Sequence, residues 1–268
     1  MKLFPALSPI AQSIGDPKTS HLFEALLRDV RYSFRMMRKA PGFTVVAVLT
    51  LACGIAANVL VFSVLNALVL RPIDLPRARD LFMIEFGKHH FEQSYPDYLD
   101  LRDRSRGFEG VVAFTISAAG LDNGHGSTQA WIYECSANYF DVLGIQPHLG
   151  RFFHSSDEHG PDSAPYIVLS YAYWQSHYQG DPAVVGRTVE LNKYPYTILG
   201  VAPPKFRGTA LFFAADLWVP LVNQAQIEGE LNARGRRAFW IVGRKKSGVS
   251  MAQLTGDLDS LAAWLAKN

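Results

Sequence analysis

The sequence is short of net charge and of cysteine, and each shortage excludes a class of protein. Its 26 Lys and Arg against 24 Asp and Glu leave a formal net charge of +2. Such a weak field gives no reason to expect a nucleic-acid partner. The two cysteines, Cys53 and Cys135, lie in an apolar run and in a polar region. We therefore expect no disulfide between them, and a domain that is held together by its own core.

Nucleotide-binding and hydrolytic motifs are also missing. The single Gly-Lys pair, Gly87-Lys88, is followed by His89 and does not complete the phosphate-binding pattern GxxxxGK[ST]. The sequence has no GxSxG motif and no cysteine pair at metal-binding spacing. We therefore predict no enzymatic activity, no catalytic, cofactor-binding or metal-binding residues and no cofactor. Substrate-binding residues stay unknown.

Two groups of side chains could still serve a ligand. The adjacent His89 and His90 would point to opposite faces of a strand, which does not suit a shared ligand. A second group could bind a cation, although its serine, glycine and proline neighbours favour a solvated loop: His154, Asp157, Glu158 and His159. Four tryptophans could line a ligand groove, but their apolar neighbours favour core packing: Trp131, Trp174, Trp218 and Trp240.

Charge is absent from one long stretch, the 29 residues from Gly42 to Leu70. A helix needs roughly 20 apolar residues to cross a bilayer. At ~1.5 Å per residue this stretch reaches about 44 Å, beyond the ~30 Å hydrocarbon core. We predict a transmembrane helix over residues 42–70, tilted or projecting from the membrane. A buried core helix, a cleaved signal peptide and a lipoprotein signal ending at Cys53 are the alternatives, and the length and position of the run disfavour them.

Two segments precede this run. Residues 1–20 carry prolines and glycine among small polar residues, which predicts a flexible tail. Residues 21–41 place apolar side chains at helical spacing opposite a basic face, which predicts an amphipathic helix at the membrane interface. Packing on a soluble partner is the alternative. Five Lys and Arg before the run and four after it do not decide the topology, and we favour a cytoplasmic N-terminus.

The remaining residues, 71–268, alternate between strand and helix patterns. The fold class expected is α+β, with one transmembrane helix followed by a two-lobed mixed α/β domain. We expect helices after Ser94, over 138–143, after Ser170 and after Ser250. The periodicity predicts strands over 81–86, 111–119, 129–136, 166–169, 187–191, 196–201, 216–221 and 239–244. A hairpin should turn at Asn192-Lys193.

Several motifs together resemble MacB/FtsX-type ABC transporter permeases, in particular the acidobacterial duplicated orphan permeases. In the membrane part these are LRDVRY at 27–32, RKAPGFT at 38–44, GIAAN at 54–58 and LRP at 70–72. In the polar part they are SYPDY at 94–98, NYFDVLG at 138–144, GRFF at 150–153, VLS at 168–170, GDP at 180–182, VGR at 185–187, YTILGVAP at 196–203 and GVS at 248–250. In this order they cover about residues 22–266.

The one charge-free run predicts a single-pass protein, and the resemblance implies the cell inner membrane, with the N-terminus in the cytoplasm and the C-terminal domain in the periplasm. Residues 71–268 would form a MacB-like periplasmic core domain, with one lobe at 73–142 plus 228–268 and an inserted smaller lobe at 143–227. The implied partners are the lipid bilayer, a separate ABC ATPase subunit, and a second copy or a related permease. The domain would transmit ATPase-driven motion for efflux or envelope remodelling.

The sequence departs from such permeases at its C-terminus. They continue with a closing strand, three further membrane helices and a cytoplasmic coupling segment, so we expect a truncated permease. Its last helix, residues 251–267, would leave an unpaired sheet edge. The alternative function is a membrane-anchored periplasmic binding or interaction module without transport activity. The transported substrate is not predicted.

Overall fold

The computed structural model divides the chain into two compact units, Met1–Leu70 and Arg71–Asn268. It describes residues 28, 31–32, 35–65, 75–85, 92–124, 126–210, 213–227, 229, 231–233 and 235–265. The tail predicted at 1–20 and the pair His89-His90 lie outside these residues, as does most of the interfacial helix predicted at 21–41. Residues 35–39 of that segment are helical.

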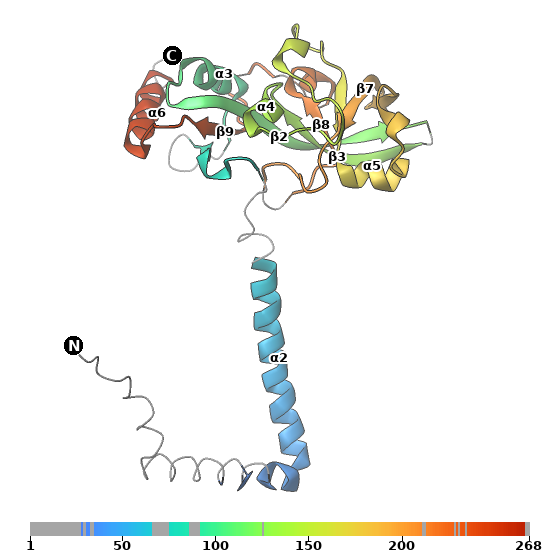
Figure 1. The fold of residues 1–268 in the computed structure, drawn as a ribbon, viewed down its shortest axis with the longest axis vertical. Coiled ribbons are helices and arrows are strands. Elements are labelled where there is room, and N and C mark those ends of the chain that lie inside the picture. Colours follow the sequence, from blue (N-terminus) through green and yellow to red (C-terminus); the bar gives the residue numbers. More distant parts are fainter. Residues whose placement is uncertain are drawn as a thin grey trace, which may run out of the picture. The chain divides into compact units, whose positions relative to one another are not determined.

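Among its described residues, the first unit contains one long apolar helix, α2 (Pro41–Leu65; Figure 1). Proline is favoured in the first turn of a helix, where its missing N–H would have no partner in any case. Helix α2 reaches about 37 Å at ~1.5 Å per residue. Its segment Pro41–Ser63 is the one helix among the described residues that is long and apolar enough to cross a membrane. The predicted helix was placed at 42–70, and residues 66–70 lie outside the described part.

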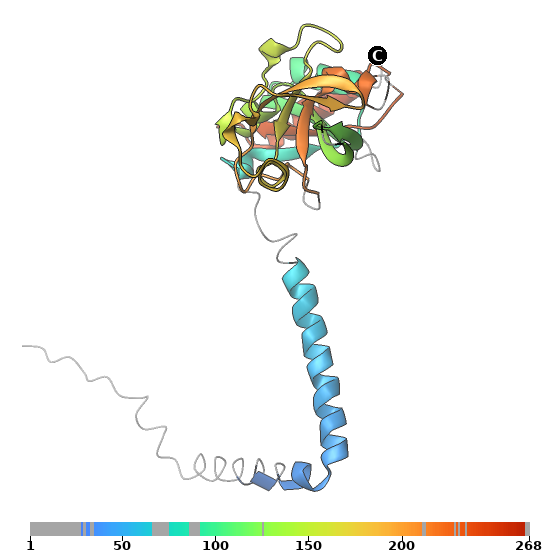
Figure 2. The same ribbon diagram turned by 90° about the vertical axis from the view of Figure 1, so that its right-hand side faces the viewer.

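The two threonine hydroxyl groups of α2 are satisfied within the first unit itself. The Thr44 hydroxyl donates to the carbonyls of Met37 and Ala40, at 2.8 and 3.0 Å. The Thr50 hydroxyl donates to the Val46 carbonyl at 2.8 Å. Lipid offers no hydrogen-bond partners, so this pattern suits a helix surrounded by acyl chains. Figure 2 shows α2 as a single uninterrupted helix.

The second unit is built on one mixed sheet of nine described strands, in the order β1-β9-β2-β3-β8-β5-β7-β4, with β6 pairing with β2 and β7. Strand β1 ends this order and, among these strands, pairs only with β9. The strands are β1 (Leu81–Ile84), β2 (Phe108–Asp122), β3 (Ser127–Cys135), β4 (Leu149–Gly150), β5 (Tyr166–Leu169), β6 (Thr188–Leu191), β7 (Tyr194–Val201), β8 (Leu217–Pro220) and β9 (Trp240–Lys245).

The helices of this unit begin where the sequence predicts. Ser94 caps α3 (Tyr95–Arg104) in a reciprocal pair with Asp97, and Ser170 caps α5 (Tyr171–Tyr178) through the Tyr173 N–H at 3.1 Å. Each cap supplies a partner for an N–H that the first turn leaves unpaired. The other helices are α4 (Tyr139–Leu143) and α6 (Met251–Leu265). The described part of this unit also has short 3₁₀-helices at Ala78–Asp80, Ser155–Asp157, Pro182–Val184 and Leu221–Gln226.

Strand β2 contributes to all three hydrophobic clusters of the unit. Val111 packs into a cluster with α3 and α6, and the next residue, Val112, packs into a second cluster with α4. This alternation follows from the two-residue period of a strand. Farther along the strand, Ala119 and Leu121 pack with α5 and β5–β7. The α3/α6 and α5 clusters therefore share one face of β2, and the α4 cluster lies on the other.

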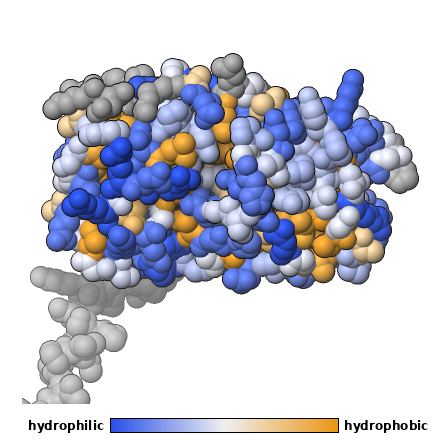
Figure 3. Space-filling view, turned by 90° about the horizontal axis from the view of Figure 1, so that it is seen from above, coloured by the Kyte–Doolittle hydropathy of each residue, from blue (hydrophilic) through white to orange (hydrophobic). Residues whose placement is uncertain are grey.

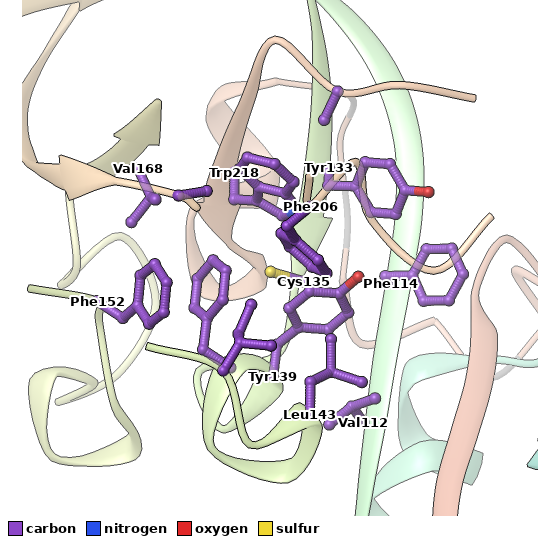
Figure 4. Packing of buried hydrophobic residues seen from close by; sticks show 14 of the residues in the cluster. Val112, Phe114, Tyr133, Cys135, Tyr139, Leu143, Phe152, Val168, Phe206 and Trp218 are labelled. Carbon is purple, nitrogen blue, oxygen red and sulfur yellow. The ribbon is translucent and has the colours of Figure 1, made fainter. Parts of the chain in front are cut away.

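The α4 cluster is rich in aromatic rings (Figure 4). Phe140 stacks on Phe152 with ring centroids 3.9 Å apart, and Trp218 stacks on Phe206 at 5.2 Å. Aromatic pairs of this kind contribute roughly 0.5–1.5 kcal/mol beyond the area that they bury. On the face shown in Figure 3, by contrast, apolar residues form small groups among polar ones.

The predicted hairpin is present between β6 and β7. Asn192 and Lys193 both have positive φ, 50° and 72°, which suits the twist of a two-residue turn. The Asn192 side chain accepts a hydrogen bond from the Gly120 N–H at 2.9 Å. This contact to β2 helps to hold a turn in which lysine takes a conformation that glycine would adopt more readily.

Candidate coupling site at the domain entrance

The described part of the second unit begins at Leu75, ten residues after the end of α2 at Leu65. Leu75 is 8% exposed and belongs to the α4 cluster, so the domain core starts at this residue. Two residues later Arg77 adopts a left-handed conformation, with φ of 52°, and begins the turn Ala78–Asp80 that leads into β1. We call residues 75–80 the entry segment. A movement transmitted along the chain from α2 to the domain must pass through it.

The Arg77 side chain binds two carboxylates at the surface. Its Nη2 donates to Glu109 at 2.8 Å, and its Nε donates to Asp80 at 3.1 Å. The hydrogen bond from Arg77 holds the pKa of the Glu109 carboxyl below its usual value. Exposed pairs contribute little to stability. Here they orient the entry segment against the first residues of β2.

Beneath this surface, Arg244 on β9 connects three parts of the domain. The residue is 5% exposed, and its guanidinium donates to the Val142 carbonyl at 2.6 Å, the Leu143 carbonyl at 3.1 Å and the Arg77 carbonyl at 3.1 Å. Burial lowers the pKa of Arg244, and the nearby Arg77 lowers it further. Because the planar guanidinium presents five fixed donors, it can hold the end of α4 and the entry segment at once.

Helix α4 lies directly on the backbone of β2. A Cβ atom built on Gly110 would lie 2.5 Å from Val142 Cγ2, so a larger residue there would push the helix away. The helix ends at Gly144, whose φ of 66° allows the chain to turn back. Arg244 then supplies donors to carbonyls that the helix end leaves unpaired. The contact between β9, α4 and the entry segment is thus tightly packed.

An open groove of about 550 Å³ adjoins the entry segment. Its floor is formed by buried Leu75, Ile145 and Phe206, and these three residues are 6–9% exposed. The rim is formed by Pro76, Pro203, Pro204 and Lys205. The groove is therefore apolar at its base and carries one cationic side chain at its edge.

The membrane helix has a shallow groove of its own, about 560 Å³, along one face. Its lining is formed by Ala47, Thr50, Leu51, Gly54, Ile55 and Asn58. Spacings of three and four residues put these side chains on the same side of the helix. The face combines small residues, which allow close helix packing, with the amide of Asn58, which would lack water in a bilayer.

The group at 154–159, for which the sequence favoured a solvated loop over a cation site, is dispersed. His154 contacts Asp141 on α4, with Nδ1 2.9 Å from the carboxylate, and Asp157 binds Arg151 at 2.8 Å. The Glu158 carboxyl is partly buried near Arg102, and desolvation raises its pKa to about 7. Within the described ranges, no three His, Cys, Asp or Glu side chains gather in a way that could hold a metal ion.

Three of the four tryptophans pack in the core, as predicted. Trp218 and Trp174 are buried and Trp240 is half-buried. The prediction is wrong for Trp131, which is 48% exposed and packs edge-on against Phe213 with ring centroids 5.5 Å apart. Its position on β3 is outward because the neighbours Ala130 and Ile132 take the inward positions.

The sequence analysis missed Arg244. The signal available was one arginine close after the apolar residues Trp240–Val242, but its three carbonyl partners are 101 or more positions away. No local pattern brings these segments together. The groove at the entrance was missed for the same reason, because its lining comes from three separate parts of the chain.

Comparison with known proteins identifies the domain. The profile of the MacB-like periplasmic core domain family matches residues 44–261. The periplasmic region of MacB from Actinobacillus actinomycetemcomitans is similar in fold, with 21% identity over 70% of this chain and 83% of that one, and a TM-score of 0.55. The extracellular domain of the ABC-type transporter YknZ from Gram-positive bacteria matches with 15% identity over 70% of this chain and 94% of that one, and a TM-score of 0.50. No match to a curated protein was found.

Proposed function

Since this chain belongs to the MacB-like periplasmic core domain family, found in MacB/FtsX-type permeases, we propose that it serves as a permease subunit of a MacB-type ABC transporter. It would be a single-pass protein of the cell inner membrane, with a cytoplasmic N-terminus and a periplasmic domain. A separate ATPase would supply the motion, and this chain would pass it to the domain for efflux or envelope remodelling. The chain itself would carry no catalytic residues.

The contact of Arg244 with Arg77 is the observation that carries this proposal. The Arg77 carbonyl lies two residues beyond the first described residue of the domain, and Arg244 joins it to α4 and β9. A displacement of the entry segment would therefore move the packed helix α4 and strand β9 together. Coupling of this kind needs a contiguous physical connection, and the three hydrogen bonds of Arg244 supply one.

Self-association through α2 is the second part of the proposal. An amide in lipid gains by finding a partner, and interhelical hydrogen bonds contribute about 0.6–2 kcal/mol. Gly54 leaves open space on the same face as Asn58, because nothing lies within 4 Å of a Cβ built there. A second copy or a related permease helix would fit against this face.

Purification of the tagged full chain from its native membranes tests the proposal. We expect an ABC ATPase to co-purify in mild detergent, and to be recovered in cross-links made before solubilisation. If the chain is folded and embedded in the membrane but no ATPase is recovered by either route, the transporter proposal is wrong. Recovery of a periplasmic protein alone would instead support the binding-module alternative.

A further inference from the structure

Lipid, a second copy of the chain or another protein could cover the groove at the domain entrance, and the residues around the groove favour lipid. We propose that the groove formed by Leu75, Ile145, Phe206 and its proline rim rests on an anionic lipid surface, with Lys205 and Arg207 among the headgroups. The proposal concerns the bilayer as a partner of the folded domain. It does not depend on the proposed transport function, because a membrane-anchored binding module would carry the same surface.

The backbone of the rim is suited to a low-dielectric surface. Pro76, Pro203 and Pro204 have no N–H groups, so covering them with lipid leaves no backbone donors without water. The N–H of Phe206, two residues after Pro204, donates to the Pro203 carbonyl at 3.0 Å. Pro76 and Pro204 are exposed, so these rings form the outer edge of the apolar surface.

Exposed basic side chains lie close in sequence to the lining of the groove. Lys205 and Arg207 are exposed and flank Phe206, and Arg79 is exposed three residues after Pro76. The whole segment 199–215 contains no Asp or Glu. The acidic residues closest in sequence to Pro76 are Asp74 and Asp80, and Asp80 is bound to Arg77. An apolar surface bordered by basic side chains is the arrangement that binds the headgroup region of anionic membranes.

The short connection between Leu65 and Leu75 sets an upper limit on the distance from the end of the membrane helix to the groove. Ten Cα–Cα steps join Leu65 to Leu75, and a fully extended chain advances at most about 3.6 Å per step. Leu75 therefore lies within about 36 Å of the end of α2 in every arrangement of the two units. Helix α2, at about 37 Å, is longer than the ~30 Å hydrocarbon core, so its end reaches the headgroup region. A lipid surface is thus within reach of this groove whatever else binds the domain.

Spin labelling of the full chain in vesicles tests the proposal. A Pro204→Cys variant, in a Cys53→Ser background, carries the label at the rim, and Tyr194→Cys carries it on the exposed hairpin as a control. Cys135 is fully buried, and the background variant without a new cysteine measures any labelling there. The vesicles contain phosphatidylcholine with or without phosphatidylglycerol. Collisions with oxygen, which enters lipid, are compared with collisions with a water-soluble nickel chelate.

We expect the label at residue 204 to collide with oxygen severalfold more, relative to nickel, than the label at residue 194. The ratio should fall when phosphatidylglycerol is removed. Lys205→Gln with Arg207→Gln, made with the label kept at residue 204, should weaken lipid contact on the order of tenfold. Both substitutions are at exposed positions, and tryptophan fluorescence verifies that the variant is folded.

Two results would overturn the proposal. Equal collision ratios at residues 204 and 194 would mean that the groove is in water. Protection of residue 204 from both oxygen and nickel would mean that protein covers the groove, either a second copy or another partner. Neither result bears on whether an ATPase co-purifies, so failure here and failure of the transporter proposal can be distinguished.

Discussion

A single carboxylate oxygen of Asp257, on α6, accepts hydrogen bonds from the backbone N–H groups of Arg106 and Gly107, at 2.8 and 3.0 Å. Gly107 must be small as well, because a Cβ atom there would lie 2.6 Å from Leu254 Cδ1 on the same helix. One helix near the C-terminus thus closes the loop between α3 and β2.

Asp257→Ala should therefore destabilise the domain. The change leaves two backbone donors without their charged partner, which costs about 1–3 kcal/mol. Urea unfolding of the full chain in detergent, followed by tryptophan fluorescence, measures the loss. Asp259→Ala, two residues away at an exposed position, is the matched control and should change stability by less than about 0.5 kcal/mol. Equal stability of the two variants would contradict the closing role of Asp257.

The Glu158 carboxyl should make stability depend on pH. Its pKa is raised by desolvation from 4.5 to about 7, against the opposing effects of Arg102 and the Ala137 backbone. Between these values the folded chain binds more protons than the unfolded chain, so stability falls as the pH rises from about 4.5 to about 7. After allowance for its partial exposure, the loss is about 1–2 kcal/mol.

Glu158→Gln tests this expectation, since glutamine has the same shape and does not titrate. The variant should unfold at a similar urea concentration at pH 5 and should exceed the parent at pH 7.5. Parallel stability profiles for the two proteins across this range would show that another group controls the dependence.

Arg244→Lys should lower the stability of the domain and weaken its coupling to ATP hydrolysis. Lysine keeps the positive charge but cannot reproduce the fork that reaches three carbonyls, so we expect a loss of about 1–3 kcal/mol. In the co-purified complex, ATP hydrolysis should continue while its link to the periplasmic domain weakens. The measurement is the ATP-dependent change in fluorescence of a probe placed on the domain surface. Arg187→Lys, at an exposed ion pair elsewhere, serves as the control. An unchanged signal in Arg244→Lys would rule out the proposed connection.

Gly208→Ala should displace the loop that supplies Phe206 to the groove. Gly208 has a φ of 103°, and a Cβ atom there would lie 2.6 Å from Cζ of Tyr133. We expect a loss of about 1–3 kcal/mol and faster cleavage of this loop in limited proteolysis. Gly124→Ala has a similar φ of 91° but open space around it, so it measures the backbone strain alone. Identical behaviour of the two variants would mean that Tyr133 does not restrict the loop.

Asn58→Leu should weaken self-association of α2. Loss of one interhelical hydrogen bond of about 0.6–2 kcal/mol corresponds to roughly 3- to 30-fold in the association constant. Energy transfer between donor- and acceptor-labelled chains in vesicles measures this change as the protein is diluted in lipid. Leu60→Ala, on a different side of the helix, should leave the transfer unchanged. If both substitutions act alike, the face formed by Ala47, Gly54 and Asn58 is not the interface.

Local signals predicted most of the elements. The absence of charge indicated α2, and the serines at 94 and 170 marked helix starts, because capping is a short-range interaction. The extent of β2 was underestimated, since its pattern suggested 111–119 and the strand runs from Phe108 to Asp122. Its ends are stabilised by pairing with β9, β3 and β6, and such pairing cannot be read from one segment.

The functional surface was less predictable than the fold. Arg244, the entrance groove and the exposure of Trp131 all depend on which distant segments meet. The lobe boundaries taken from the family resemblance stay a prediction. The sequence did indicate that a surface for contacts should be sought, because it lacks the motifs of an active site that were searched for.

The long strand β2 has a mechanical consequence. It takes part in every hydrophobic cluster of the domain and pairs along its length with β9, β3 and β6. Bending the sheet between its ends would break hydrogen bonds and open packed side chains at the same time. The domain should therefore rotate as one rigid body when a force acts at its entrance. A small rotation at Arg77 would then become a larger displacement at the β6–β7 hairpin.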